Sequence, residues 1–166
     1  MYILAQYIAI LKEQGSNHKA FSTYWKQKGI TLQQGEETFH PYCDTMNGAP
    51  NMTIKVPTAG GKTFIACNAI RTIFDAMPVN RTKVVAWFVP SDTILKQTYE
   101  NQKNPQHPYR QRIDTLFNGR VGVYDKQALL FGQNFNPTII KEQLSIFVLS
   151  IQSFATKATD KRLVYN

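Results

Sequence analysis

Residues 56–63 read VPTAGGKT, and this run constrains the fold more than any other part of the chain. Gly60 and Gly61 allow a tight backbone turn, because neither carries a Cβ atom that would obstruct it. Successive backbone N–H groups in such a turn point inward and form a concave site for an anion. The ending Gly61-Lys62-Thr63 is that of a Walker A motif, so the run predicts a phosphate-binding loop between a strand and a helix.

The side chains of this loop have separate predicted tasks. Lys62 is the candidate catalytic residue, because its ammonium group would reach the β- and γ-phosphates of a nucleoside triphosphate. The Thr63 hydroxyl is the predicted ligand of Mg²⁺. Val56 stands where the general pattern has glycine, so the match to that pattern is incomplete. The predicted cofactor-binding residues are Pro57, Thr58, Ala59, Gly60, Gly61, Lys62 and Thr63.

The sequence around the loop alternates between short apolar runs and longer amphipathic segments. The short runs predict strands at residues 52–56, 83–89, 120–124 and 145–151. The longer segments predict helices at residues 63–77, 93–102, 109–117 and 137–143. Strands that alternate with helices in this way favour an α/β fold, with a parallel sheet and helices flanking it.

The first fifty residues follow a different pattern. Apolar residues recur at helical spacing over residues 1–14, and a second short helix is predicted at residues 20–27. Residues 29–50 are rich in turn-forming residues and form a connection. The first run is too short to span a bilayer and lacks the features of a signal peptide, so no membrane association is expected. We therefore divide the chain into a helical N-terminal extension, residues 1–50, and a main domain, residues 51–166.

The charge balance favours a polyanionic partner. The chain has 19 Lys and Arg residues against 11 Asp and Glu, which gives a formal net charge of +8. Lys and Arg residues that neutralise phosphates release bound counterions and so favour nucleic-acid binding. Cys43 and Cys67 have no metal-binding or redox spacing, and a chain without a disulfide framework suits the reducing cytoplasm. The three histidines form no ligand cluster in the sequence.

Four segments together carry a resemblance to a known family. They are TIKVPTAGGKTFIACNAI at 53–70, WFVPSDTILKQ at 87–97, VGVYD at 121–125 and FVLSIQSF at 147–154. On these segments the chain resembles superfamily 2 helicases and translocases, and it is most similar to the N-terminal part of the type III restriction enzyme helicase (Res) subunit. The resemblance covers residues 53–154, and the phosphate-binding loop is its most specific part.

The resemblance implies a fold, cofactors and partners. It implies an incomplete RecA-like domain that binds ATP and Mg²⁺ and contacts the backbone of double-stranded or single-stranded DNA. The residues implied in DNA contact are Pro90 and Ser91, which follow one predicted strand, and Gln152, which follows another. Ser91 or Asp92 is also a suitable helix cap. In a full system the partner protein would be a modification or specificity subunit.

The resembled family also uses two acidic residues, the DExx box, to hold Mg²⁺ and to orient the attacking water. This sequence contains no Asp-Glu pair. Asp125 ends a run that is short, contains Gly122 and is followed by Lys126, so we do not assign it this role. We expect the chain to be a fragment of an ATP hydrolase that stops before the DExx box, and to bind nucleotide better than it hydrolyses it. Gln33, Gln34, Phe39 and Tyr42 are possible adenine contacts, but they form no recognisable pattern.

Two alternatives remain at this point. The first is a phosphate-binding-loop protein of another class, such as a small kinase. Val56 and the lack of an Arg-rich lid in the sequence count against this reading. The second is a non-catalytic module that binds nucleic acid or a partner and retains a relic of the loop. The missing DExx box favours this alternative as strongly as it favours a truncated motor domain.

Overall fold

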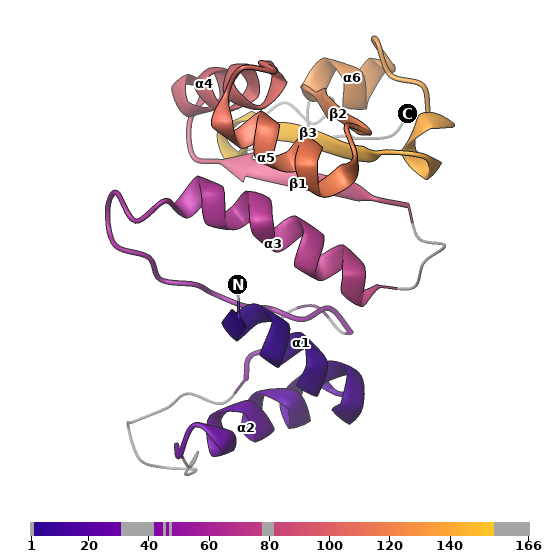
Figure 1. Cartoon of the computed structure of the whole chain (residues 1–166). Helices are drawn as coiled ribbons and strands as arrows, with labels where there is room; N and C mark the ends of the chain where they lie inside the picture. Colours follow the sequence, from indigo (N-terminus) through magenta and orange to yellow (C-terminus); the bar gives the residue numbers. More distant parts are fainter. Residues whose placement is uncertain (1, 31–41, 45, 47, 78–81, 155–166) are drawn as a thin grey trace. The chain divides into compact units, whose positions relative to one another are not determined.

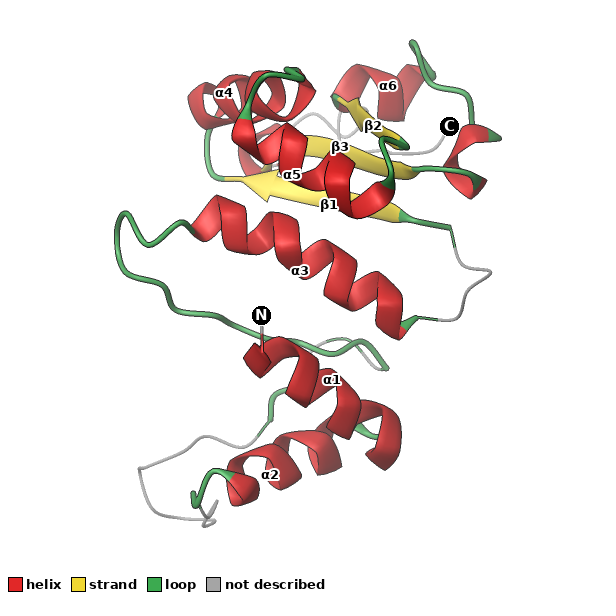
Figure 2. Ribbon diagram, viewed as in Figure 1, coloured by secondary structure: helices red, strands yellow, loops and turns green. Residues whose placement is uncertain are grey.

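The computed structural model of the chain describes residues 2–30, 42–44, 46, 48–77 and 82–154. The chain divides into two compact units, residues 1–65 and residues 66–166. The boundary between them falls inside helix α3 (Lys62–Ala76). Figure 1 follows the chain by colour, and Figure 2 shows its helices and strands.

The first unit contains a pair of packed helices. Helix α1 (Tyr2–Gln14) and helix α2 (Asn17–Gln27) confirm the two predicted helices, although α2 begins earlier than expected. The early start follows from Ser16, whose Oγ accepts a hydrogen bond from the Lys19 N–H and caps the helix. The two helices bury a small core against each other, formed by Tyr7, Ile10, Ala20 and Tyr24.

The second unit is built on a three-stranded parallel sheet with the strand order β1-β3-β2. The strands are β1 (Val84–Val89), β2 (Val121–Tyr124) and β3 (Leu144–Ser150). All seven residues of β3 are buried, as expected of a central strand covered on both faces. The three strands lie side by side in Figure 2.

Helices cover both faces of this sheet. The main core joins one face of the sheet to α3, α4 (Asp92–Lys103) and α5 (Pro108–Phe117). On the other face, α6 (Lys126–Phe131) packs over Phe147 and Leu149 of β3. Alternate residues of β3 therefore enter different cores, which is the period of an extended strand. This arrangement confirms the predicted α/β class and is that of an incomplete RecA-like domain.

Two ion pairs with the same helical spacing occupy different surroundings in the second unit. Arg110 and Asp114 lie in α5 at 2.8 Å, with side chains 16% and 30% exposed. Arg110 also donates a hydrogen bond to the Val121 carbonyl, at 3.0 Å, and so ties α5 to β2. Arg71 and Asp75 lie in α3, also at 2.8 Å, but their side chains are 45% and 56% exposed.

The structure corrects three of the predicted elements. The strand predicted at residues 52–56 is wrong, because these residues form no strand and Met52 and Ile54 are 37% and 53% exposed. An apolar run becomes a strand only where a neighbouring strand pairs with its backbone. Helix α6 was not predicted. The helix expected at residues 137–143 is a single 3₁₀ turn at Ile139–Lys141.

Candidate functional site

The backbone of the loop at residues 56–63 enters the left-handed region twice. Ala59 and Gly61 both adopt left-handed conformations, with φ angles of +62° and +71°, and they flank Gly60. The Gly60 N–H donates a hydrogen bond to the Pro57 carbonyl at 3.0 Å, which closes the turn. Left-handed residues next to right-handed ones turn successive N–H groups towards a common centre and form an anion-binding concavity.

Helix α3 begins directly after this turn. Its first residue is Lys62, and the Ile65 N–H donates to the Gly61 carbonyl at 2.9 Å, within the first turn of the helix. The first N–H groups of a helix lack partners inside it, and they carry its positive dipole end. The loop therefore leads directly into the N-terminal end of α3, where the sequence placed the start of a helix.

The Lys62 side chain turns back over its own loop. Its Nζ donates a hydrogen bond to the Pro57 carbonyl at 3.1 Å. The same carbonyl accepts the Gly60 N–H, so one oxygen holds both the turn and the lysine. Lys62 is exposed, and Thr63 is half-buried in the first turn of α3. Pro57, Thr58 and Ala59 are exposed in the loop before them.

Val56, which departs from the usual motif, is adjacent to Gly60. A Cβ atom added to Gly60 would lie 2.6 Å from Cγ1 of Val56 and 3.0 Å from the Pro57 carbonyl oxygen. Both distances are shorter than ordinary van der Waals contact, so Gly60 is required because Val56 and the turn carbonyl occupy the space. By contrast, a Cβ atom added to Gly61 would meet nothing within 4 Å, and only its positive φ favours glycine.

A second group of candidate residues lies at the carboxyl edge of the sheet. Strands β1 and β3 are parallel, and their last residues, Val89 and Ser150, are paired in register. Pro90 and Ser91 follow β1, and Gln152 lies in the 3₁₀ turn η2 (Ile151–Phe154) after β3. Parallel pairing therefore brings the three predicted DNA-contacting residues to one edge of the sheet, where ligands bind in open α/β folds.

Two residues at this edge cap helices. Ser91 is the N-cap of α4, and its Oγ accepts a hydrogen bond from the Ile94 N–H at 3.4 Å. Asp125 follows β2 and is the N-cap of α6, with Oδ1 accepting from the Ala128 N–H at 3.0 Å. The carboxylate of Asp125 is therefore engaged by its own backbone.

The residues considered for adenine contact fall mostly outside the described part of the chain, which includes Tyr42 but not Gln33, Gln34 or Phe39. Tyr42 is buried, and its hydroxyl accepts a hydrogen bond from the Asn51 N–H at 2.7 Å. Its ring packs edge-on against His18, with the ring centres 5.3 Å apart. In this structure Tyr42 anchors the segment that leads towards the loop.

Within the described ranges, the His, Cys, Asp and Glu residues form no metal-binding group. No group of three or more His, Cys, Asp or Glu residues among the described residues is arranged to hold a metal ion. Burial raises the pKa of the Cys67 thiol to about 11, which keeps the thiol protonated at neutral pH. Among the helices that the structure describes, none is long and apolar enough to cross a membrane.

The parallel sheet and the helices on both of its faces define an incomplete α/β domain of the RecA-like class. The sequence matches the family described as type III restriction enzyme, res subunit, over residues 6–165. The chain therefore belongs to this family and corresponds to its helicase-like ATPase motor region, which confirms the resemblance seen in the sequence. Searches of the curated proteins and of the solved structures each gave no significant match.

Proposed function

We propose that this chain binds Mg-ATP through residues 57–63 and contacts the backbone of DNA through Pro90, Ser91 and Gln152. In this proposal the chain is the nucleotide-binding part of a DNA-dependent ATPase motor. The observation that carries the proposal is the backbone of the loop, where left-handed Ala59 and Gly61 flank Gly60 directly before the first turn of α3.

Nucleotide binding would use groups that the loop already presents. The triphosphate would accept hydrogen bonds from loop N–H groups and lie at the positive end of α3. Lys62 would exchange the Pro57 carbonyl for the β- and γ-phosphate oxygens, which are stronger acceptors because they are charged. Thr63, in the first turn of α3, would place its hydroxyl on Mg²⁺.

DNA binding would use the carboxyl edge of the sheet. The free N–H groups at the start of α4 can hold a phosphate, and Ser91 and Gln152 can donate hydrogen bonds to the backbone. Contacts of this type position a protein on nucleic acid without reading its sequence. The net charge of +8 is consistent with this role and predicts binding that weakens as salt rises.

We further propose that the chain binds ATP better than it hydrolyses it. Hydrolysis requires a carboxylate that can hold Mg²⁺ or orient water, and Asp125 is engaged as a helix cap. Rapid turnover of Mg-ATP by the purified chain would contradict this part of the proposal. We also propose a modification subunit as the partner protein.

Calorimetric titration with Mg-ATP tests the nucleotide site. Lys62→Ala removes a charge-assisted contact to phosphate, and we expect affinity to fall about 10- to 100-fold. Lys55→Ala is the matched control, because Lys55 is an exposed lysine just before the motif. A GTP titration measures base preference. Equal losses in the two variants would show that general charge, and not the loop, binds the nucleotide.

Fluorescence anisotropy with labelled DNA tests the strand-end contacts. Ser91→Asp retains a good helix cap but places a negative charge against any phosphate at the start of α4. Ser91→Thr retains both the cap and a neutral hydroxyl, so it is the control. We expect the Asp variant to bind DNA more weakly and the Thr variant to bind normally, with Gln152→Ala weakening binding further. Unchanged affinity of the Asp variant would exclude Ser91 from the contact.

A further inference from the structure

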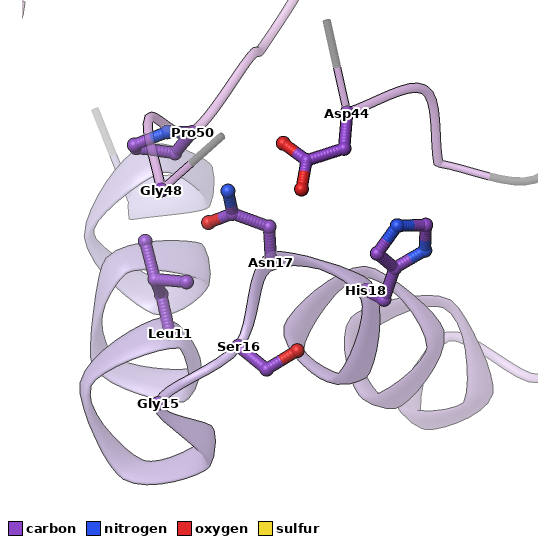
Figure 3. A pocket seen from close by; sticks show the side chains of 8 residues that line it. All are labelled: Leu11, Gly15, Ser16, Asn17, His18, Asp44, Gly48 and Pro50. Atoms are coloured by element: carbon purple, nitrogen blue, oxygen red, sulfur yellow. The ribbon is translucent and has the colours of Figure 1, made fainter. Parts of the chain in front are cut away.

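A pocket of about 410 Å³ lies beside the turn between α1 and α2, entirely within the first unit. We call it the hairpin pocket. The turn residues Gly15, Ser16 and Asn17 form one side of it, and Asp44 and Pro50 come from the later segment (Figure 3). None of its lining residues belongs to the phosphate-binding loop or to the sheet.

Asn17 is the most informative residue of the hairpin pocket. It is the first residue of α2 and only 9% exposed, yet its amide group points into the pocket (Figure 3). Among the described residues, the amide of Asn17 has no hydrogen-bond partner. Its oxygen and nitrogen are not among the fully buried side-chain atoms that lack a partner, so both are open to the pocket and to water. Its carbonyl oxygen and amino group are therefore available to a ligand.

The charge of the pocket comes from Asp44. Its carboxylate is exposed and faces the Asn17 amide across the pocket in Figure 3. Helix α1 ends at Gln14 and helix α2 begins at Asn17, so a negative and a positive helix end meet beside the pocket and offset each other. The Ser16 hydroxyl oxygen is already occupied by the Lys19 N–H. The His18 ring also lines the pocket. The acceptors that the pocket offers a ligand are thus the Asp44 carboxylate, which is also its negative charge, and the Asn17 amide oxygen.

Apolar atoms complete the pocket. Leu11 of α1 lines it below Pro50 in Figure 3. A ligand that fits these surroundings has a cationic group rich in donors and an alkyl stem that packs against Leu11 and Pro50. We propose that the hairpin pocket binds the guanidinium group of an arginine side chain presented by a partner protein.

The geometry of guanidinium explains the preference for arginine over lysine. Guanidinium is planar and has five N–H donors, so it can donate to the Asp44 carboxylate and to the Asn17 amide oxygen at the same time. An ammonium group is a compact, strongly hydrated charge and matches two separate acceptors less well. Phosphate and other anions are disfavoured because the Asp44 carboxylate repels them.

Titration of the full 166-residue chain with a blocked tripeptide tests the proposal. The tripeptide carries a central arginine, and binding is followed by the amide chemical shifts of Gly15, Asn17 and Gly48. We expect saturable shifts at these residues. Matched tripeptides with citrulline, which replaces guanidinium with neutral urea, or with lysine should bind at least about tenfold more weakly. Equal binding of the citrulline peptide, or binding of inorganic phosphate in place of the arginine peptide, would overturn the proposal.

Three variants locate the contact. Asp44→Asn should weaken binding of the arginine peptide about tenfold or more, because it removes the negative charge. Asn17→Asp adds a carboxylate at the start of α2, where a negative charge is favourable to the helix, and should tighten binding. Glu13→Gln removes an exposed carboxylate of α1 outside the pocket and should have little effect. Equal effects of Asp44→Asn and Glu13→Gln, or weaker binding by a folded Asn17→Asp variant, would contradict the assignment.

Discussion

A change of Gly60 to alanine tests whether Val56 is the reason that Gly60 must be a glycine. The added Cβ would lie 2.6 Å from Cγ1 of Val56 and 3.0 Å from the Pro57 carbonyl oxygen. Overpacking of this kind costs about 1–3 kcal/mol. The turn would have to shift to admit the Cβ, and the loop N–H groups proposed to bind phosphate would move with it, so we expect Gly60→Ala to weaken Mg-ATP binding about 5- to 140-fold.

A double-mutant cycle separates the two contacts. Val56→Ala removes the Cγ1 atom and leaves the Pro57 carbonyl in place. In that background the loss caused by Gly60→Ala should be smaller, with a coupling energy of about 1 kcal/mol or more. Gly61→Ala is the matched control. Its added Cβ has no close neighbour and its cost of about 1–2 kcal/mol comes only from the positive φ, so it should not change with the Val56 background.

The assay is calorimetric titration of Mg-ATP with the four chains of the cycle and the Gly61 controls. Hydrogen exchange at the Ile65 N–H, which donates to the Gly61 carbonyl, reports separately on whether the loop and the first turn of α3 stay formed. If Gly60→Ala is equally harmful with valine and with alanine at position 56, then Val56 does not explain the requirement for glycine. The reasoning from the close contact would then be refuted.

Two further predictions concern the second unit. Asp114→Asn should lower the free energy of unfolding by about 1–2 kcal/mol, and Asp75→Asn by less than about 0.5 kcal/mol, because Asp114 is the less exposed of two equally short ion-pair partners. Urea denaturation measures both, and equal losses would contradict the role of burial. Cys67 should react with thiol reagents only on unfolding, whereas exposed Cys43 should react at once. Because burial raises the Cys67 pKa to about 11, its stabilising contribution should be complete below about pH 9 and lost as pH rises towards 11, and denaturation at several pH values would detect this.

The sequence predicted the second unit well because its signals are local. Helices α4 and α5 have caps at Ser91 and His107, and the strongly apolar run of β3 is fully buried. The strand at residues 52–56 failed for a non-local reason, because an apolar run does not specify whether a partner strand is present. Helix α6 was missed because it has only six residues, and its cap, Asp125, was considered only as a possible metal ligand.

The candidate sites likewise contain some features that the sequence predicted and some that it did not. Glycine spacing predicted the turn at Gly60 and Gly61, and the apolar runs predicted that Ser91 and Gln152 follow strands. The left-handed conformation of Ala59 was not predictable, because alanine carries no sign of a positive φ. The hairpin pocket was also missed, since Asn17 and Asp44 are far apart in the sequence and each is an ordinary residue there.

A ligand of the loop must replace an existing hydrogen bond of Lys62 before it can bind the lysine. Without a ligand, the Lys62 ammonium group donates a hydrogen bond to the Pro57 carbonyl, which takes the place that a ligand oxygen would occupy. A ligand must outcompete that carbonyl, and a neutral or singly charged ligand gains little by doing so. We therefore expect the resting loop to select against common monoanions such as chloride or acetate, and to release its lysine only to ligands that carry several negative charges together.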